Sequence, residues 1–254
     1  MRGNSIKKIV IANWKMQLTL KESVALAKEV VRGVTETSGA IVLCPSFTAL
    51  ASVGALVHGK IALGAQDVFW EAKGAYTGAI GPRLLVEMGC RYVLVGHSER
   101  RRYCGETDSM VNKKVLAALA AGLIPVICVG ETAEERREVR KDFVVMRQVA
   151  EAIRGVVLSG AQQLIIAYEP VWVIGSGQAV DPDDAEYMIQ VIRHTLTDTI
   201  PPETLSRACR FLYGGSVDAK NVAAFTSRAT IDGVLVGGAS LNASAFFAMV
   251  QEVV

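Results

Sequence analysis

Histidine is scarce in this chain, and cysteine never occurs in pairs at metal-ligand spacing. The three histidines, His58, His97 and His194, lie far apart, and the five cysteines form no CxxC pair. This excludes the usual sequence patterns for structural zinc and for redox centres. The sequence also has no Walker motif and no complete dinucleotide fingerprint. We therefore expect a protein that uses neither a metal nor a cofactor, with its thiols reduced in a reducing compartment.

Long apolar runs, charge tracts and flexible linkers are also absent. The apolar run nearest the N-terminus, Ile9 to Ala12, is too short for a signal-peptide core or a membrane span. The 27 basic and 25 acidic residues nearly cancel, to a net charge of +2. No basic tract suggests nucleic acid. These absences predict a soluble, cytoplasmic protein that binds neither a membrane nor nucleic acid, and whose partner is a small molecule.

What the chain does have is a succession of short apolar segments rich in Val, Ile and Leu. Each is apolar at nearly every position, as in a strand buried on both faces, whereas a half-exposed strand would alternate. The segments are Lys8–Ala12, Ala40–Cys44, Ile61–Ala65, Tyr92–Val95, Ile124–Val129, Leu164–Tyr168, Arg210–Tyr213 and Gly233–Val236.

Amphipathic helical patterns separate these segments. Asp181 followed by Pro182 predicts a capped helix start, and the capping box that begins at Thr132 predicts another. We expect the second helix to bury an apolar face made of Val139, Phe143, Met146, Ala150 and Ile153. Eight strands each followed by a helix favour a (β/α)8 barrel, one domain over residues 1–254. A doubly wound open sheet is the alternative.

In such a barrel the active site lies where the strands end at their carboxyl side. Five polar or glycine-rich clusters follow the predicted strands, and we expect them to meet at one mouth. They begin at Asn13, Gly96, Glu169, Gly214 and Gly237.

Three residues in these clusters could carry chemistry. A lysine after a strand, such as Lys15, is usually a solvated charge, and a lone histidine such as His97 is more often structural. Glu169 is more informative, because an apolar segment precedes it and Pro170 follows it. A carboxylate at a buried strand end is costly unless it is used.

The two Gly-Gly pairs, Gly214-Gly215 and Gly237-Gly238, follow the last two predicted strands. Backbone N–H groups can approach an anion closely where no Cβ obstructs them. In barrels this position is a common phosphate site. The pairs therefore predict a phosphorylated substrate. The class of enzyme stays open at this point: a sugar-phosphate isomerase, an aldolase or a non-catalytic barrel scaffold would all fit.

Taken together, the motifs of this chain resemble the triosephosphate isomerase family over nearly its whole length. They are Ala12-Asn13-Trp14-Lys15-Met16, Gly64-Ala65-Gln66-Asp67, Gly74-Ala75-Tyr76-Thr77-Gly78, Val95-Gly96-His97-Ser98-Glu99-Arg100-Arg101, Tyr168-Glu169-Pro170-Val171-Trp172 through Gly177, Tyr213-Gly214-Gly215-Ser216-Val217 and Val236-Gly237-Gly238-Ala239-Ser240. The resemblance implies an isomerase without cofactor that interconverts dihydroxyacetone phosphate and glyceraldehyde 3-phosphate.

The resemblance also implies a role for each candidate residue. Glu169 would be the catalytic base and His97 the electrophile. Lys15, with Asn13 beside it, would supply positive charge to the enediolate and the phosphate. Gly175, Ser216, Gly237 and Gly238 would hold the phosphate, under a lid formed by residues 171–177. The lid departs from the family pattern at Val173, Ser176 and Gln178.

By the same resemblance the protein is a homodimer whose loop from Gly74 to Gly81 inserts into the partner subunit. The family commonly has a glutamate at the position of Ala79, where it pairs with an arginine of the partner. Since Ala79 cannot form this pair, we expect Arg100 to pair within its own subunit, for instance with Glu106.

Overall fold

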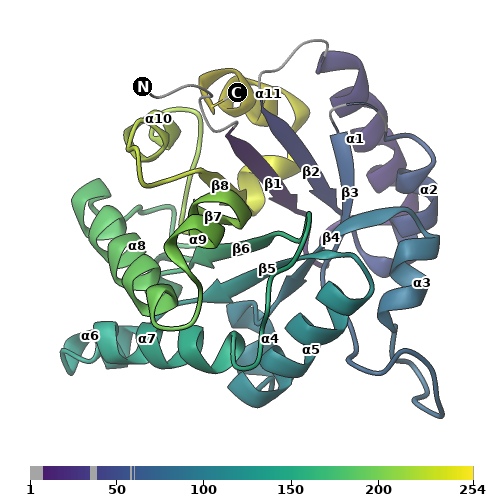
Figure 1. Cartoon of the computed structure of the whole chain (residues 1–254). Coiled ribbons are helices and arrows are strands. Elements are labelled where there is room, and N and C mark those ends of the chain that lie inside the picture. Colours follow the sequence, from purple (N-terminus) through teal and green to yellow (C-terminus); the bar gives the residue numbers. More distant parts are fainter. Residues whose placement is uncertain (1–7, 35–38, 58, 60, 254) are drawn as a thin grey trace.

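The computed structural model describes residues 8–34, 39–57, 59 and 61–253. Its eight strands are all parallel and form a closed barrel in chain order, because β1 pairs with both β2 and β8 (Figure 1). The strands are β1 (Ile9–Asn13), β2 (Ala40–Cys44), β3 (Ile61–Ala65), β4 (Cys90–Val95), β5 (Ile124–Val129), β6 (Leu164–Tyr168), β7 (Cys209–Tyr213) and β8 (Gly233–Val236). The predicted barrel is confirmed, and the open-sheet alternative is wrong.

The strand predictions agree closely with the structure. Five of the eight bounds coincide, β4 and β7 start one or two residues earlier than predicted, and β1 is displaced by one residue. The displacement of β1 matters for the site, because Asn13 is the last residue of the strand and not the first residue of the loop.

Helices surround the barrel (Figure 1). They are α1 (Leu20–Gly33), α2 (Leu50–Gly54), α3 (Pro82–Glu87), α4 (Ser98–Tyr103), α5 (Asp108–Ala120), α6 (Ala133–Arg137), α7 (Lys141–Ala152), α8 (Pro182–Thr197), α9 (Pro202–Ala208), α10 (Val222–Thr226) and α11 (Ala243–Val253), with short 3-10 helices at η1 (Phe47–Ala49), η2 (Val171–Val173) and η3 (Gly238–Leu241). Asp181 caps α8, as predicted, and accepts a hydrogen bond from the Asp183 N–H.

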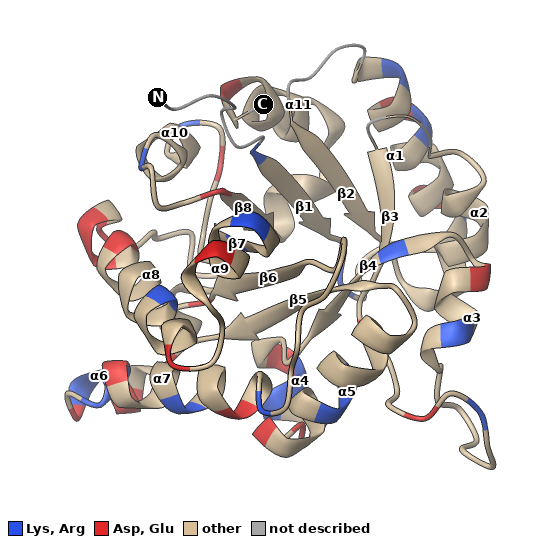
Figure 2. Ribbon diagram, viewed as in Figure 1, with Lys and Arg blue, Asp and Glu red and all other residues tan. Residues whose placement is uncertain are grey.

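Two apolar layers explain why the strands do not alternate in polarity. Side chains of one parity, such as Ile11 and Leu94, fill the barrel interior. Those of the other parity, such as Val10 and Val93, pack between the strands and the helices. Both faces of every strand are therefore buried. Charged side chains lie mostly on the outer helices and loops, with both signs interspersed (Figure 2).

The prediction of one long helix after Thr132 is wrong. The capping box of Thr132 and Glu135 is present, but α6 ends at Arg137 and α7 begins at Lys141. The break lies at Val139, which has a φ of 57° and is 89 % exposed. The face that α7 buries also differs, since its core residues are Val144, Val145, Gln148, Val149 and Ala152; of the predicted face only Ile153, at the C-cap, is buried.

Two further features concern the thiols and the helices. All five cysteines are free; Cys104 is exposed and the other four are buried. Among the helices in the described residues, none is both long enough and apolar enough to cross a membrane.

Candidate active site

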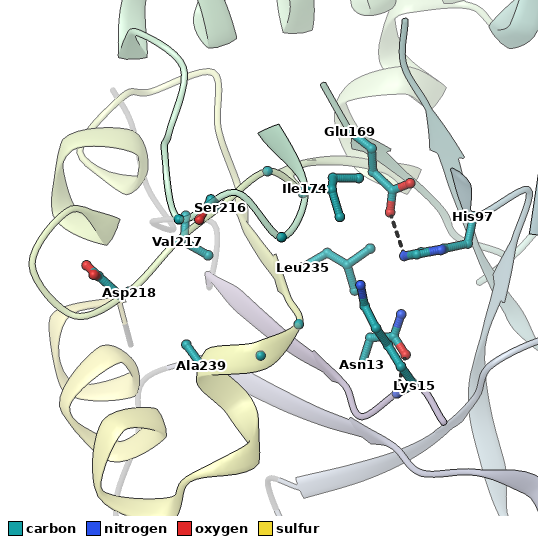
Figure 3. A pocket seen from close by; sticks show the side chains of 16 residues that line it. Asn13, Lys15, His97, Glu169, Ile174, Ser216, Val217, Asp218, Leu235 and Ala239 are labelled. Atoms are coloured by element: carbon teal, nitrogen blue, oxygen red, sulfur yellow. Dashed lines mark hydrogen bonds and ion pairs between the residues drawn. The ribbon is translucent and has the colours of Figure 1, made fainter. Parts of the chain in front are cut away.

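A cavity of about 340 Å³ opens at the carboxyl ends of the strands. The side chains of Lys15, His97 and Glu169 converge on it from three different strand ends (Figure 3). All eight residues predicted for the site line this one cavity: Asn13, Lys15, His97, Glu169, Gly175, Ser216, Gly237 and Gly238. Residues far apart in the sequence therefore meet as the barrel rule requires.

The backbone holds Lys15 in an unusual conformation. Its φ of 52° lies in the left-handed region, which costs a residue with a Cβ about 1–2 kcal/mol. Two side chains stabilise this turn: Asn13 Oδ1 accepts from the Lys15 N–H at 3.0 Å, and Gln66 Nε2 donates to the Lys15 carbonyl at 2.8 Å. These two hydrogen bonds hold Lys15 in its strained conformation and thereby fix the direction of its side chain.

The ammonium group of Lys15 has one anionic contact, Glu99 Oε1 at 2.6 Å. Glu99 is 42 % exposed at its side chain, so solvent screens this ion pair. The Lys15 stem also runs close to the second glycine pair, because a Cβ at Gly237 would lie 3.3 Å from Lys15 Cε. The lysine thus extends from β1 across the mouth toward β8.

His97 sits immediately before α4 and is its N-cap. The Glu99 N–H donates to His97 Nδ1 at 3.2 Å, so we assign Nδ1 as unprotonated and place the proton of a neutral imidazole on Nε2. Glu99 Oε2, at 3.6 Å from Nδ1, is too far to compete for that position. His97 is therefore arranged to donate from Nε2 into the cavity.

Glu169 follows β6 and is 2 % exposed. Its Oε2 accepts from the Ser98 N–H at 3.1 Å, and its Oε1 lies 3.3 Å from His97 Nε2 (Figure 3). Burial, and then the Glu169 carboxylate, raise the pKa of the neighbouring Cys128 thiol, which keeps that thiol neutral. A Cβ at Gly214 would approach Glu169 Cγ to 2.9 Å, so a glycine is needed beside the carboxylate.

The opposite end of the cavity is formed by the loops after β7 and β8. Gly215, Ser216, Gly237 and Gly238 line it. A Cβ at Gly238 would meet nothing within 4 Å, so the backbone there is open to the cavity. Backbone N–H groups in such a loop, together with the Lys15 ammonium, form an environment suited to a phosphate.

The segment from Val171 to Gly177 covers one side of the cavity through Ile174 and Gly175. Ser176 preserves a hydroxyl in this lid: its Oγ donates to the Val173 carbonyl at 2.8 Å and accepts from the Gln178 N–H at 3.1 Å. At the far end of the lid, Tyr213 Oη accepts from the Val180 N–H at 3.3 Å.

Glu131 anchors the start of the lid, a role that no sequence pattern indicates. Its buried carboxylate accepts from Trp172 Nε1 at 3.0 Å and from the Tyr168 hydroxyl at 3.1 Å. Arg136 lies 3.4 Å from the same carboxylate, with its guanidinium 4.7 Å from the Trp172 ring centre. Burial, and then the charge of Glu131, raise the pKa of Tyr168, which keeps the phenol a donor.

A second ion-pair cluster lies behind α4, outside the lining of the cavity. Arg100 pairs with Glu106 at 2.7 Å, as predicted, and also with Asp67 at 2.8 Å. Lys114 pairs with the same two carboxylates, at 2.6 Å to Asp67 and 2.9 Å to Glu106. Glu106 Oε1 also accepts from the Gly96 N–H, one residue before His97.

In the part of the chain that the structure describes, no three His, Cys, Asp or Glu side chains are grouped so that they could hold a metal ion. His58, one of the three histidines, lies outside the described residues. The polar groups of the cavity are a carboxylate, an imidazole, an ammonium and backbone N–H groups, which suit proton transfer on a small anion.

Beyond the predicted set, sequence reasoning missed Ser98, Glu99, Cys128, Glu131 and Gln66. Ser98 and Glu99 follow His97 directly, so the expectation of a short helix there carried a usable signal. The other three act on residues far away in the sequence, for example Glu131 on Trp172, and although Gln66 lies in one of the quoted motifs, no local pattern indicates what any of them contacts.

The chain is similar to known proteins over almost its full length. The family model described as Triosephosphate isomerase matches residues 8–253. Proteins named triosephosphate isomerase from Moorella thermoacetica and Thermoanaerobacter pseudethanolicus are 48 % and 46 % identical to it over 245 and 244 residues. Each alignment covers 96 % of this chain, and 97 % and 98 % of the respective relative. The protein of that name from Chloroflexus aurantiacus is 43 % identical over 245 residues, which is 96 % of this chain and 98 % of that protein.

Proposed function

The chain belongs to the triosephosphate isomerase family and is an isomerase of dihydroxyacetone phosphate and glyceraldehyde 3-phosphate, and we propose that Glu169, His97, Lys15 and Asn13 carry out this reaction. The observation that carries the assignment of roles is the convergence of Glu169, His97 and Lys15 on one cavity with the two glycine pairs. A base, a neutral donor and a cation then face the same small substrate.

Glu169 removes a proton from carbon 1 of dihydroxyacetone phosphate and returns it to carbon 2. An α-proton is weakly acidic, so the carboxylate must be desolvated, and Glu169 is nearly fully buried. Its two oxygens are engaged by the Ser98 N–H and by His97 in this structure. The side chain therefore turns away from Ser98 to reach the substrate carbon.

The electrons released by deprotonation move onto the carbonyl oxygen and form an enediolate. His97 donates to this oxygen from Nε2 and passes the hydroxyl proton between the two substrate oxygens. This enzyme family is itself the established example of a neutral catalytic histidine that acts as a hydrogen-bond donor. The hydrogen bond from the Glu99 N–H to Nδ1 supports the same assignment here.

Lys15 stabilises the enediolate oxygen and the phosphate by its charge, and Asn13 holds the turn from which Lys15 extends. The phosphate binds against the backbone of Gly175, Ser216, Gly237 and Gly238. An enediolate phosphate can lose its phosphate if water reaches it, so the lid of residues 171–177 closes over the bound intermediate.

A coupled assay in excess EDTA tests the activity and the proposed base together. We expect full turnover with chelator present, because every proposed step uses only the residues of the chain. Glu169→Asp, which withdraws the carboxylate by one methylene, should lower kcat/KM by about 10²–10³-fold with unchanged folding. Glu203→Asp on the exposed side of α9 is the matched control. Wild-type kcat/KM in Glu169→Asp would show that Glu169 is not the base.

The proposal includes a cytoplasmic homodimer in which residues 1–254 form one domain. The loop from Gly74 to Gly81 projects beyond β3 and α3 (Figure 1), and Tyr76 on it is 46 % exposed. Met16, next to Lys15, is 95 % exposed. Insertion of this loop beside Met16 of the other subunit would cover both apolar surfaces and support Lys15.

Deleting Ala75 to Ala79 tests this dimer. The deletion should give a monomer with much reduced turnover, because Lys15 would lose the contact that supports its turn. Sedimentation velocity measures the mass, and the coupled assay measures the turnover. A wild-type protein that is monomeric and fully active at micromolar concentration would contradict the proposed dimer.

A further inference from the structure

Helix α7 buries one polar side chain against the barrel, that of Gln148, which is 6 % exposed. Both hydrogen bonds described for its amide go to a single residue, Gly130. Oε1 accepts from the Gly130 N–H at 2.8 Å, and Nε2 donates to the Gly130 carbonyl at 3.1 Å. Only this orientation of the amide satisfies both backbone groups, so the oxygen and the nitrogen are assigned without ambiguity. Gln148 therefore clamps one peptide segment from outside the barrel.

Gly130 follows β5 at a point where the neighbouring strand on one side has ended. The register pairs Val95, the last residue of β4, with Ile127, so β4 has no strand residue opposite Gly130. A buried backbone N–H and carbonyl need partners, and at this position no strand supplies them. Gln148 takes the place of the missing strand, because its amide offers the same donor and acceptor as a peptide group.

The other side of this strand end lies against the proposed base. The Val129 carbonyl accepts from the Glu169 N–H at 2.7 Å, and the Glu131 carbonyl accepts from the Val171 N–H at 3.1 Å. A Cβ at Gly130 would lie 1.7 Å from the Glu169 carbonyl oxygen, so the two backbones are in direct contact and only glycine fits. Residues 129–131 therefore set the position of the base and of the first residue of the lid.

We propose that Gln148 is a positioning residue for the reaction: by clamping Gly130 it holds the backbone of Glu169 where the carboxylate can reach carbon 1 of the substrate. The inference rests on the proposed function, in which Glu169 is the base. Gln148 lies on α7, outside the lining of the cavity, and acts only through Gly130. The core packing of Val144 and Val149 on the same helix holds the clamp in place.

Loss of the clamp should affect proton transfer more than substrate binding. The proposed phosphate site lies on the loops after β7 and β8, at Ser216, Gly237 and Gly238, whereas Gly130 lies at the end of β5. Proton abstraction depends more steeply on position, since a displacement of about 1 Å can cost about 10²-fold in rate. We therefore expect a change in kcat with little change in KM.

Gln148→Met tests this expectation, because methionine has a similar length but cannot bond to Gly130. Its kcat should fall by at least about 10-fold, with KM within about 3-fold of the wild type. Asn112→Leu is the matched control. Asn112 is 8 % exposed and donates to the carbonyls of Ala152 and Arg154, at the other end of α7.

Both variants lose two buried hydrogen bonds to the backbone near α7, so both should have a lower melting temperature. Only Gln148→Met should lose kcat. A wild-type kcat in folded Gln148→Met would overturn the proposal. An equal loss of kcat in Asn112→Leu would overturn it too, because the effect would then follow from stability alone.

Gln148→Glu tests the hydrogen bonds themselves. A protonated carboxyl group can accept from the Gly130 N–H and donate to the Gly130 carbonyl, whereas a carboxylate cannot donate. Burial raises the pKa of a carboxyl group, so the introduced group should gain its proton between about pH 9 and 6. The kcat of Gln148→Glu relative to the wild type at the same pH should therefore rise as the pH falls. A ratio that stays low at every pH would overturn the clamp.

A double variant separates this inference from the proposed function. If Gln148 acts through Glu169, Gln148→Met should slow Glu169→Asp by a smaller factor than it slows the wild type, because the carboxylate is already displaced. Full multiplication of the two effects would overturn the proposal and leave Glu169 as the base. Wild-type kcat/KM in Glu169→Asp alone would instead contradict the proposed base, and this inference with it.

Discussion

Two charged clusters meet at α4 and differ in how their charges are balanced. Glu99 points toward the cavity and pairs with Lys15, whereas Arg100, the next residue, points into the cluster behind the helix. In that second cluster two cations and two carboxylates form a closed set, in which each cation contacts both carboxylates. In the cavity, Glu169 instead contacts a neutral imidazole and a backbone N–H.

The difference separates a structural role from the catalytic role proposed for Glu169. Burial by itself would raise the pKa of Glu106, but Lys114 and Arg100 hold it below its usual range, so this carboxylate is ionised and fully compensated. Glu169 is equally buried, but no lysine or arginine is bonded to it among the contacts described; its partners are the His97 imidazole and the Ser98 N–H. A compensated charge stabilises the fold, and an uncompensated one is available for chemistry.

The largest effect is expected from removing the cation of the cavity. Lys15→Met should lower kcat/KM by at least about 10³-fold, because the ammonium serves both the enediolate oxygen and the phosphate. The melting temperature should change little, since the Glu99 that it leaves unpaired is solvated. Steady-state kinetics measure the effect, with Lys21→Met on exposed α1 as the control. A loss below 10-fold would remove Lys15 from the catalytic set.

The next effect is on stability and comes from the closed cluster. Glu106→Gln should lower the free energy of unfolding at pH 7 by about 3 kcal/mol, because it leaves Lys114 buried with one carboxylate fewer. The kcat/KM of the folded variant should change only a few-fold. Urea unfolding at fixed protein concentration measures the first quantity.

The pH dependence of this variant has a defined sign. Because the folded pKa of Glu106 is depressed, its stabilisation is fully present above the unfolded value near 4.3 and is lost as pH falls through the folded pKa. The difference in the free energy of unfolding between the wild type and Glu106→Gln should therefore shrink as the pH is lowered from 7 to below 4. A constant difference would show that the charge of Glu106 is not what stabilises the fold.

A smaller effect is expected at the lid. Glu131→Gln replaces a carboxylate that accepts from Trp172 and Tyr168 by an amide with only one accepting atom. The closed conformation of the lid should be less populated, and kcat should therefore fall by about 10-fold, which corresponds to about 1.4 kcal/mol in the activation free energy. Glu134→Gln on exposed α6 is the control. If both variants keep wild-type kcat, Glu131 does not set the rate of lid closure.

The smallest effect is expected at Asp67, the other carboxylate of the closed cluster. Burial raises the pKa of Asp67, despite Lys114, so its ion pairs and its desolvation largely cancel. Asp67→Asn should change the free energy of unfolding at pH 7 by at most about 1 kcal/mol.

The contribution of Asp67 to stability changes with pH in the direction opposite to that of Glu106. A raised folded pKa means that ionising Asp67 costs stability as the pH rises through it. The wild type should thus lose stability relative to Asp67→Asn between about pH 4 and 7. If the free energies of unfolding of the wild type and Asp67→Asn changed with pH in parallel, the raised pKa of Asp67 would be contradicted.

How far the sequence predicts this site depends on the distance over which each residue acts. Lys15, His97 and Glu169 are found because each follows an apolar segment, and parallel strands in a barrel bring those ends together. Glu131 and Gln148, in contrast, act on residues distant in the sequence: Glu131 accepts from Trp172 and Tyr168, and Gln148 bonds to the Gly130 backbone. Such contacts depend on side-chain packing and leave no periodic pattern.

The face of α7 shows the same limit for a helix. Val139, Phe143 and Met146 have the spacing of a buried stripe, but α7 buries Val144, Val145 and Val149 instead. Both stripes are apolar, so the sequence cannot choose between them. The choice follows from the break at Val139, which changes the rotation at which α7 meets the barrel.

The sequence by itself therefore determined the strands, the barrel and the position of each proposed catalytic group at a strand end, because these depend on local polarity and a general rule of the fold. Only the tertiary structure decided the hydrogen-bond partners of His97, the closed cluster of Arg100 and Lys114, and the side of α7 left to solvent. Each of these depends on which groups face one another across the folded chain, and the free energy of a charge or an apolar surface is set by those neighbours.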